Sequence, residues 1–332
     1  MDRVLLLTLA DGPPATDGCG ACGASCLGAA RAAEGAGDEP DACATPTLRV
    51  AVLACRDALV AEGVAVEVVT ACSDAEIDAA LERFDGPPRA DGLRWPATDG
   101  GTGLVVAVDV DGQLRAVVRR MVRRYAPAPS KRPADLPTGR TLPDLPALAI
   151  LPLRREPSPG PYPDLVDRLG LPRDPADVAK ALLHGHVQRL DLLRNDGGSV
   201  TLHGALFGRE TLWRARIDVD DAQLAGPDDE IVACAVANAD GYASAEGLPL
   251  APGADPADGQ VSVAVAVPVT VRGRFGRKEQ RLEVRRARGR AVAVEPVDEI
   301  DFLDDGVAGT LSRKRSWWIE PGAWGVHRAA SA

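Results

Sequence analysis

Residues 104–113 read LVVAVDVDGQ, and this stretch decides the fold of the first half of the chain. Its first five residues form an apolar run of strand length, and Asp109–Gln113 form an acidic turn directly behind it. Leu114, Val117 and Met121 then recur at helical spacing. A strand that passes through a turn into a helix is typical of a parallel α/β sheet, where phosphate-handling turns lie at the carboxyl ends of strands.

The same alternation of strand and helix signals covers residues 1–153. Buried strands are predicted at four apolar runs: 3–8, 64–70, 104–108 and 148–153. Ser73 and Glu76 form a capping box that opens a helix between two of these runs. A Gly/Ala/Cys-rich insertion at 11–45 interrupts the order. We therefore expect a doubly wound α/β domain over residues 1–153.

The second half of the chain changes character. Residues 154–185 are predicted to form a linker with helices, one of which begins at Asp174-Pro175. From residue 186 to 332 the pattern is one of short strands separated by turns, and Asn195-Asp196-Gly197-Gly198 is typical of a hairpin turn. The number and spacing of these strands predict a β-sandwich domain.

Bulk properties exclude several classes of partner. The formal net charge of −10 argues against a nucleic-acid ligand, because such proteins carry a basic surface. The longest apolar stretch, residues 261–271, is too short for a transmembrane helix. Seven cysteines, an odd number, suit a reducing cytoplasm better than a disulfide framework. The sequence leaves a homo-oligomer open.

Three longer stretches resemble a known family. They are LGLPRDPADVAKALLHGHVQRLDLL (169–193), VANADGYASAEGLPLAPGADPADGQVSVAVAV (236–267), and DDGVAG with EPGAWGV (304–326). Together with the order of elements, they resemble the diacylglycerol kinase and sphingosine kinase type of lipid kinase. The resemblance implies an α/β nucleotide domain followed by a β-sandwich. It also implies a transferase that moves a phosphoryl group from ATP, with magnesium, to a lipid or small-molecule hydroxyl.

The resemblance places a nucleotide turn behind residues 104–108. The family carries GGDGT there, and this chain has Asp109-Val110-Asp111-Gly112-Gln113. Asp111 is then the candidate catalytic acid, and Asp109 and Gly112 are candidate nucleotide contacts. Asp109 and Val110 replace two glycines that let the backbone approach phosphate oxygens, and Asp109 adds a negative charge there.

Other family motifs are also altered. At the end of the fourth predicted strand the family carries PLGTGND; here Pro152-Leu153 is followed by RREPSPGPYPD, in which only Gly160 and Asp164 correspond to the rest of that nucleotide motif. The family's DGE motif is Asp305-Gly306-Val307 here, which makes Asp305 a second catalytic candidate, while Val307 can neither accept a proton nor bind a metal. Asp255 and Asp258 match a turn that the family places near a structural metal, which predicts magnesium there; an ordinary Asp–Gly turn is the alternative.

These departures leave three functions open. The chain is interpreted as a divergent lipid kinase homologue, either active on a hydroxyl acceptor or a pseudokinase that binds a protein partner as a scaffold. In the third hypothesis a cysteine cluster at the start of the chain holds zinc or acts as a redox dithiol. The cluster comprises Cys19, Cys22, Cys26 and Cys43. Reduced thiols in a loop are the alternative.

Two basic surfaces have competing interpretations. Five arginines follow the acidic turn at helical spacing: Arg115, Arg119, Arg120, Arg123 and Arg124. They predict either a solvated helix face or a site for an anionic ligand or phospholipid headgroup. The tail SRKRSWWIEPGAW (312–324) predicts either a sandwich strand with one tryptophan on each face or peripheral membrane contact.

Overall fold

The computed structural model describes residues 1–10, 49–97, 100–154, 156, 164–208, 211–272 and 278–330. The chain divides into two compact units. The first contains the chain up to Leu190 and the segment from Ala323 onward, and the second runs from Asp191 to Gly322. No helix within the described part of the chain has the length and apolar character needed to cross a membrane.

The first unit is built on a four-stranded parallel sheet with the order β2-β1-β3-β4. The strands are β1 (Arg3–Leu9), β2 (Ala65–Ala71), β3 (Thr102–Val108) and β4 (Ala149–Pro152). Residues 4–7 and 104–107 are almost fully buried because both faces of the sheet are covered, so these strands read as continuous apolar runs. This confirms the predicted parallel α/β architecture.

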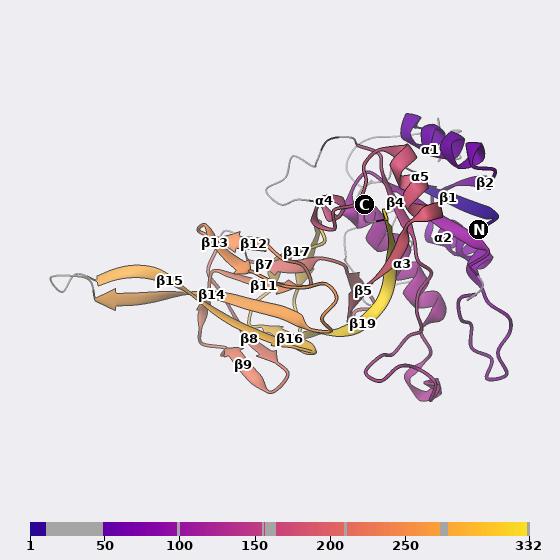
Figure 1. Ribbon diagram of the computed structural model, residues 1–332. Helices are drawn as coiled ribbons and strands as arrows, with labels where there is room; N and C mark the ends of the chain where they lie inside the picture. Colours follow the sequence, from indigo (N-terminus) through magenta and orange to yellow (C-terminus); the bar gives the residue numbers. More distant parts are fainter. Residues whose placement is uncertain are drawn as a thin grey trace, which may run out of the picture. The chain divides into compact units, whose positions relative to one another are not determined.

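Helices cover both faces of this sheet (Figure 1). On one face, α1 (Val50–Ala61) and α5 (Pro175–His184) share a core with Leu6, Val105 and Leu151. The residues that alternate with these in the strands point to the opposite face. That face is covered by α2 (Asp74–Leu81), the short η1 (Glu82–Phe84) and α3 (Asp111–Tyr125). The remaining short helices are η2 (Pro129–Lys131) and α4 (Leu165–Arg168).

Two helix starts follow the predicted signals. Ser73 is the N-cap of α2 and its side chain accepts from the Glu76 N–H at 3.3 Å, while the Glu76 carboxylate accepts from the Cys72 N–H at 2.6 Å. Asp174 caps α5 and Pro175 occupies its first turn.

The second unit is β-rich, as predicted. A six-stranded sheet has the order β15-β14-β11-β7-β17-β18, and a seven-stranded sheet runs β10-β8-β16-β19-β5-β6 with β9 beside β8. A two-stranded sheet, β12-β13, completes it. The strands are β5 (His186–Asn195), β6 (Val200–Thr201), β7 (Gly204–Phe207), β8 (Trp213–Val219), β9 (Ala222–Ala225), β10 (Glu230–Ile231), β11 (Ala233–Ala237), β12 (Tyr242–Ala245), β13 (Leu248–Ala251), β14 (Val261–Arg272), β15 (Lys278–Gly289), β16 (Ala291–Pro296), β17 (Ile300–Asp304), β18 (Val307–Leu311) and β19 (Arg315–Arg328).

An aromatic cluster holds the two large sheets together. Phe207 stacks on Phe302 with ring centroids 5.3 Å apart, and Trp317 meets Phe207 edge-on at 5.5 Å. Trp317 comes from the seven-stranded sheet and the two phenylalanines from the other, so the cluster lies in the core between them. Trp318 points the other way and donates to the Glu320 carboxylate at 3.0 Å. The strand interpretation of the tryptophan-rich tail is therefore the one that the structure shows.

Candidate functional site

The acidic turn lies at the carboxyl edge of the parallel sheet. Asp109 directly follows β3, and Val110 is the N-cap of α3, which begins at Asp111. The glycine-rich segment before β3 lies at the opposite edge, where the Asp2 N–H donates to the Gly101 carbonyl at 3.4 Å. Parallel α/β sheets bind their ligands at the carboxyl edge, so the turn at 109–113 is the candidate site.

Asp109 is held by two arginines from other parts of the unit. Its Oδ1 accepts from Arg154 Nε at 2.8 Å, and its Oδ2 lies 3.3 Å from Arg49 Nη1. Arg154 follows the end of β4, and Arg49 is the N-cap residue of α1. The hydrogen bond from Arg154 and then that from Arg49 lower the pKa of Asp109 below its ordinary value, although partial burial acts in the opposite direction. Asp109 is therefore an anion at neutral pH.

The backbone of this turn is also occupied. The Asp109 N–H donates to Gln113 Oε1 at 2.7 Å. Both carboxylate oxygens of Asp111 accept from the Leu165 N–H, at 3.3 and 3.2 Å, which joins the start of α3 to the start of α4. Gly112 is the second residue of α3 and has no positive φ that would require glycine.

Asp164 stands beside this contact as the N-cap of α4. Its side chain accepts from the Asp167 N–H at 3.0 Å and from Arg173 at 2.7 Å. Asp111 and Asp164 therefore both accept hydrogen bonds from backbone N–H groups at the start of α4. Gly160 lies outside the described residues.

A small pocket of about 150 Å³ opens next to the turn, within the first unit. Its walls are the first turn of α1, the end of β4 at Pro152 and Leu153, and the start of α5 at Pro175. Arg49 and Arg173 line it, and both form ion pairs with carboxylates of the chain. Neither Arg49 nor Arg173 was identified from the sequence, because their partners lie on other elements.

Asp305, the second catalytic candidate, belongs to the β-rich unit and has a structural role. Its side chain is buried, with 4% of its surface exposed. Oδ2 accepts from the Leu202 N–H at 2.7 Å, and Oδ1 accepts from the N–H groups of His203 and Gly204 at 2.7 and 3.2 Å. Three backbone N–H groups thus donate to one carboxylate. Val307, which stands at the glutamate position of the family's DGE motif, is buried in β18.

The predicted magnesium turn contains ordinary Asp turns. Asp255 accepts from the Ala257 N–H at 2.9 Å, and Asp258 accepts from the Gln260 N–H at 2.9 Å and pairs with Arg288. Sequence reasoning missed the buried Asp191 beside them. Its carboxylate accepts from the N–H groups of Gly259 and Gly322 at 2.6 and 2.7 Å, and burial is the main cause that raises its pKa.

A metal site is not formed by the residues that the structure describes, since they contain no group of three or more His, Cys, Asp or Glu side chains placed to hold an ion. The predicted zinc ligands Cys19, Cys22, Cys26 and Cys43 lie outside those residues. Two described cysteines, Cys55 and Cys234, are free and buried, and burial raises the pKa of Cys55 to about 12. Cys72 is disulfide-bonded, so the expectation of reduced cysteines is wrong for this residue.

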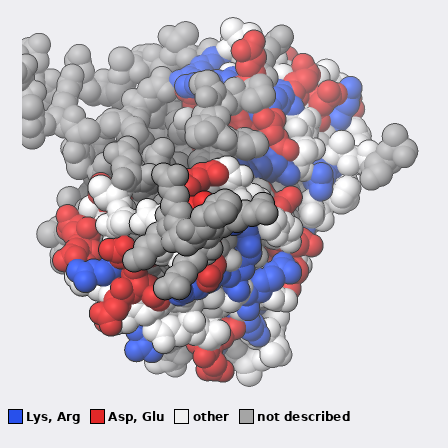
Figure 2. Space-filling model, turned by 90° about the vertical axis from the view of Figure 1, so that its left-hand side faces the viewer, with Lys and Arg blue, Asp and Glu red and all other residues white. Residues whose placement is uncertain are grey.

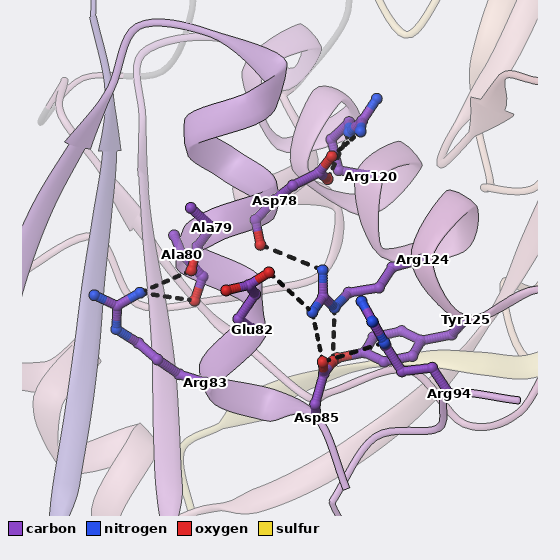
Figure 3. A network of polar contacts seen from close by, with 10 residues as sticks. All are labelled: Asp78, Ala79, Ala80, Glu82, Arg83, Asp85, Arg94, Arg120, Arg124 and Tyr125. Atoms are coloured by element: carbon purple, nitrogen blue, oxygen red, sulfur yellow. Dashed lines mark hydrogen bonds and ion pairs between the residues drawn. The ribbon is translucent and has the colours of Figure 1, made fainter. Parts of the chain in front are cut away.

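Three of the five arginines of α3 pair with carboxylates of α2 or of the segment at η1, and Figure 3 shows two of them, Arg120 and Arg124. Arg120 Nε donates to Asp78 at 2.7 Å, and Arg124 Nε donates to Asp85 at 2.6 Å. Arg119 reaches Asp74 at 3.4 Å. On the face shown in Figure 2, the basic and acidic side chains of the described residues are intermingled. Both predicted roles for this arginine row were therefore wrong for Arg119, Arg120 and Arg124.

The magnesium nucleotide that the resemblance implies does not fit the described residues of this edge. A phosphate in the turn would need backbone N–H groups and positive charge. Here the Asp109 N–H is bonded to Gln113, the nearby arginines are bonded to Asp109, and the Asp111 carboxylate is bonded to the Leu165 N–H. The turn thus provides its own acceptor oxygens in place of those of a phosphate.

Comparison with known proteins supports the fold assignment. Neither the protein-family models nor the curated protein sequences give a match. Among solved structures, a diacylglycerol kinase from Bacillus anthracis str. Sterne is 14% identical with a TM-score of 0.56, over 98% of this chain and 97% of that one. A second structure, of a putative diacylglycerol kinase from the same organism, has a TM-score of 0.57 at the same identity and coverage.

An NAD kinase from Archaeoglobus fulgidus, in complex with ATP, is also similar, at 14% identity over 98% of this chain and 94% of that one. Its TM-score is 0.48, which is too low to support an argument about this chain. The two Bacillus structures span nearly the whole chain, so the α/β unit and the β-rich unit together have the fold of the diacylglycerol kinases. At this identity the likeness concerns the fold, and function depends on the residues of the site.

Proposed function

We propose that this protein is a pseudokinase: a protein with the diacylglycerol kinase fold that acts by binding a partner and does not transfer phosphate. The observation that carries the proposal is the state of Asp111. This residue is the acid retained at the centre of the altered nucleotide turn, and both its oxygens accept from the Leu165 N–H. An acid used to join α3 to α4 is poorly placed to organise a magnesium nucleotide.

The neighbouring positions agree with this proposal. Phosphoryl transfer depends on positioning of the phosphates and on neutralisation of their charge. Asp109 and Val110 replace two glycines and add one negative charge. At about 4 Å and an effective dielectric constant of about 20, each pair of like unit charges costs roughly 4 kcal/mol. Val307 stands where the family has a glutamate, which removes a proton acceptor as well.

A second candidate function is phosphoryl transfer from ATP to a lipid or small-molecule hydroxyl. One observation favours it: Asp111 lies at the carboxyl edge of β3, where the family's catalytic turn would lie. In that case Asp111 would exchange its bond to Leu165 for the magnesium nucleotide. The two functions differ in whether ATP is bound and consumed.

The test is a pair of measurements on the full-length protein. Calorimetric titration with ATP and magnesium is expected to show no binding up to millimolar concentrations. Transfer of labelled phosphate from ATP to vesicles that contain diacylglycerol, and to a panel of soluble alcohols, is expected to stay at the level of a blank. Reproducible transfer that Asp111→Asn abolishes and Asp57→Asn retains would establish the kinase. Asp57 is a suitable control because it is an exposed acid on α1, paired with Arg56.

A further inference from the structure

The Asp109 carboxylate lies at the edge of the sheet where parallel α/β domains bind phosphate groups. It lies at the carboxyl edge of the parallel sheet, immediately behind β3, and contacts Arg154 at 2.8 Å and Arg49 at 3.3 Å. Guanidinium groups of arginine bind carboxylate oxygens and phosphate oxygens alike. The contacts that would recognise a phosphate are therefore made to a side chain of the protein itself.

Gln113 completes this arrangement. Its Oε1 accepts from the Asp109 N–H at 2.7 Å, so the first backbone donor of the turn also has an acceptor oxygen. Turns that bind phosphate offer such N–H groups to the ligand. Asp109 and Gln113 together supply oxygens to one backbone donor and two guanidinium groups. They take up donors that a bound phosphate would otherwise use.

The charges in and beside the adjoining pocket are balanced in the same manner. Each arginine there has a carboxylate partner from the chain, and the ion pairs are Arg49–Asp109, Arg154–Asp109, Arg173–Asp164 and Arg173–Asp167. Three guanidinium groups thus face three carboxylates. An incoming anion would meet no net positive charge among these six groups, although Arg49 and Arg173 line the pocket.

We infer that Asp109 is a built-in anion that closes the turn to phosphate groups, and that a neutral residue at position 109 opens an anion site formed by Arg49 and Arg154. The inference rests on the proposed function, because it gives the physical reason why the fold does not take up a nucleotide. The ligand class is a phosphate or polyphosphate without a metal ion. The side chain at position 109 then decides whether this site binds a phosphate group.

The experiment compares wild-type protein with Asp109→Asn and Asp109→Ser by calorimetric titration with inorganic triphosphate, without divalent metal and at constant ionic strength. Loss of the 109 carboxylate should leave the protein folded, because Asp109 and Arg154 are partly exposed and such ion pairs contribute little to stability. The melting temperature of each variant checks this. We expect at least tenfold tighter binding of triphosphate to both variants than to wild type.

Two controls make the comparison specific. Asp57→Asn removes one negative charge from an exposed ion pair on α1 and is expected to leave affinity at the wild-type level. Adding Arg49→Gln to Asp109→Asn is expected to remove most of the gain. Equal gains for Asp57→Asn and Asp109→Asn would reduce the effect to net charge and overturn the inference.

The remaining outcomes separate this inference from the proposed function. Folded Asp109→Asn and Asp109→Ser proteins that bind no better than wild type would show that the carboxylate does not close the turn. Wild-type protein that binds triphosphate as tightly as the variants would also show that the Asp109 carboxylate does not exclude phosphate. ATP-dependent transfer by the wild-type enzyme would overturn the proposed function, and the affinity ratio between wild type and Asp109→Asn would still decide the role of Asp109.

Discussion

Replacement of Asp305 by asparagine should destabilise the β-rich unit. The residue has a left-handed backbone, with φ of 51°, which asparagine tolerates better than most residues. Its carboxylate accepts from three backbone N–H groups, those of Leu202, His203 and Gly204. An asparagine side chain would keep one acceptor oxygen and place an amide NH₂ where the other oxygen stood. At least one backbone donor would then face another donor inside the protein.

The expected loss follows from that geometry. A buried donor left without an acceptor costs about 1–3 kcal/mol, and hydrogen bonds to a charged acceptor are stronger than neutral ones. We therefore expect the free energy of unfolding to fall by about 2–3 kcal/mol. For a unit of this size, the melting temperature should fall by about 6–9 °C, at roughly 3 °C per kcal/mol.

The assay is urea unfolding followed by tryptophan fluorescence, because the buried Trp317 reports on the core of the β-rich unit. Asp301→Asn is the matched control, since Asp301 is an exposed acid on the same strand, β17. If Asp305→Asn unfolds within about 0.5 kcal/mol of Asp301→Asn, the carboxylate does not organise the backbone of the three donors. A stable variant that had lost an activity would instead support the catalytic role expected from the sequence.

Three further substitutions test other parts of the structure. Asp85→Asn removes a carboxylate that joins the end of η1 to Arg124 of α3, and should lower the free energy of unfolding by about 1 kcal/mol in thermal denaturation; an unchanged free energy would mean that this ion pair does not contribute to stability. Burial, with help from Arg189, lowers the pKa of His327 to about 4. The unfolded chain then binds more protons between about pH 4 and 6.5. Stability should rise with pH across that window by about 2–3 kcal/mol in urea unfolding, and His327→Gln should flatten the rise. Gly185→Ala places a methyl group against the Arg328 carbonyl and should cost at least about 2 kcal/mol, so a wild-type melting temperature would contradict the packing at the end of α5.

Local patterns predicted the parts of the fold that depend on neighbouring residues. The run at 104–108 is apolar throughout because β3 is covered on both faces, and that pattern is visible in the sequence alone. Ser73 and Asp174 mark helix starts because a side-chain oxygen must satisfy backbone donors only two or three residues away. The same logic located the turn at 109–113 behind the strand.

The partners of the charged groups could not be predicted in this way. Asp109 meets Arg49 and Arg154, and neither lies near it in the sequence. Whether an arginine on α3 faces solvent or a carboxylate depends on where α2 packs, and helix periodicity carries no information about that. Asp191 gave a weak signal, as a single acid in an otherwise apolar strand, LDLL, and its meaning appears only when Gly259 and Gly322 are brought beside it.

If the proposed function is correct, the difference between a kinase and a binding protein on this fold depends on charge placement more than on the fold itself. In a turn that binds phosphate, some backbone N–H groups have no acceptor in the absence of ligand. Such unsatisfied donors lower the stability of the unliganded protein. In this chain Gln113 accepts from the Asp109 N–H, and the Asp109 carboxylate accepts from Arg154, so these donors have acceptors within the protein. A turn that satisfies its own donors in this way is stable without a nucleotide. A neutral residue at position 109 should therefore restore affinity for phosphate and leave the guanidinium groups of Arg49 and Arg154 without this partner.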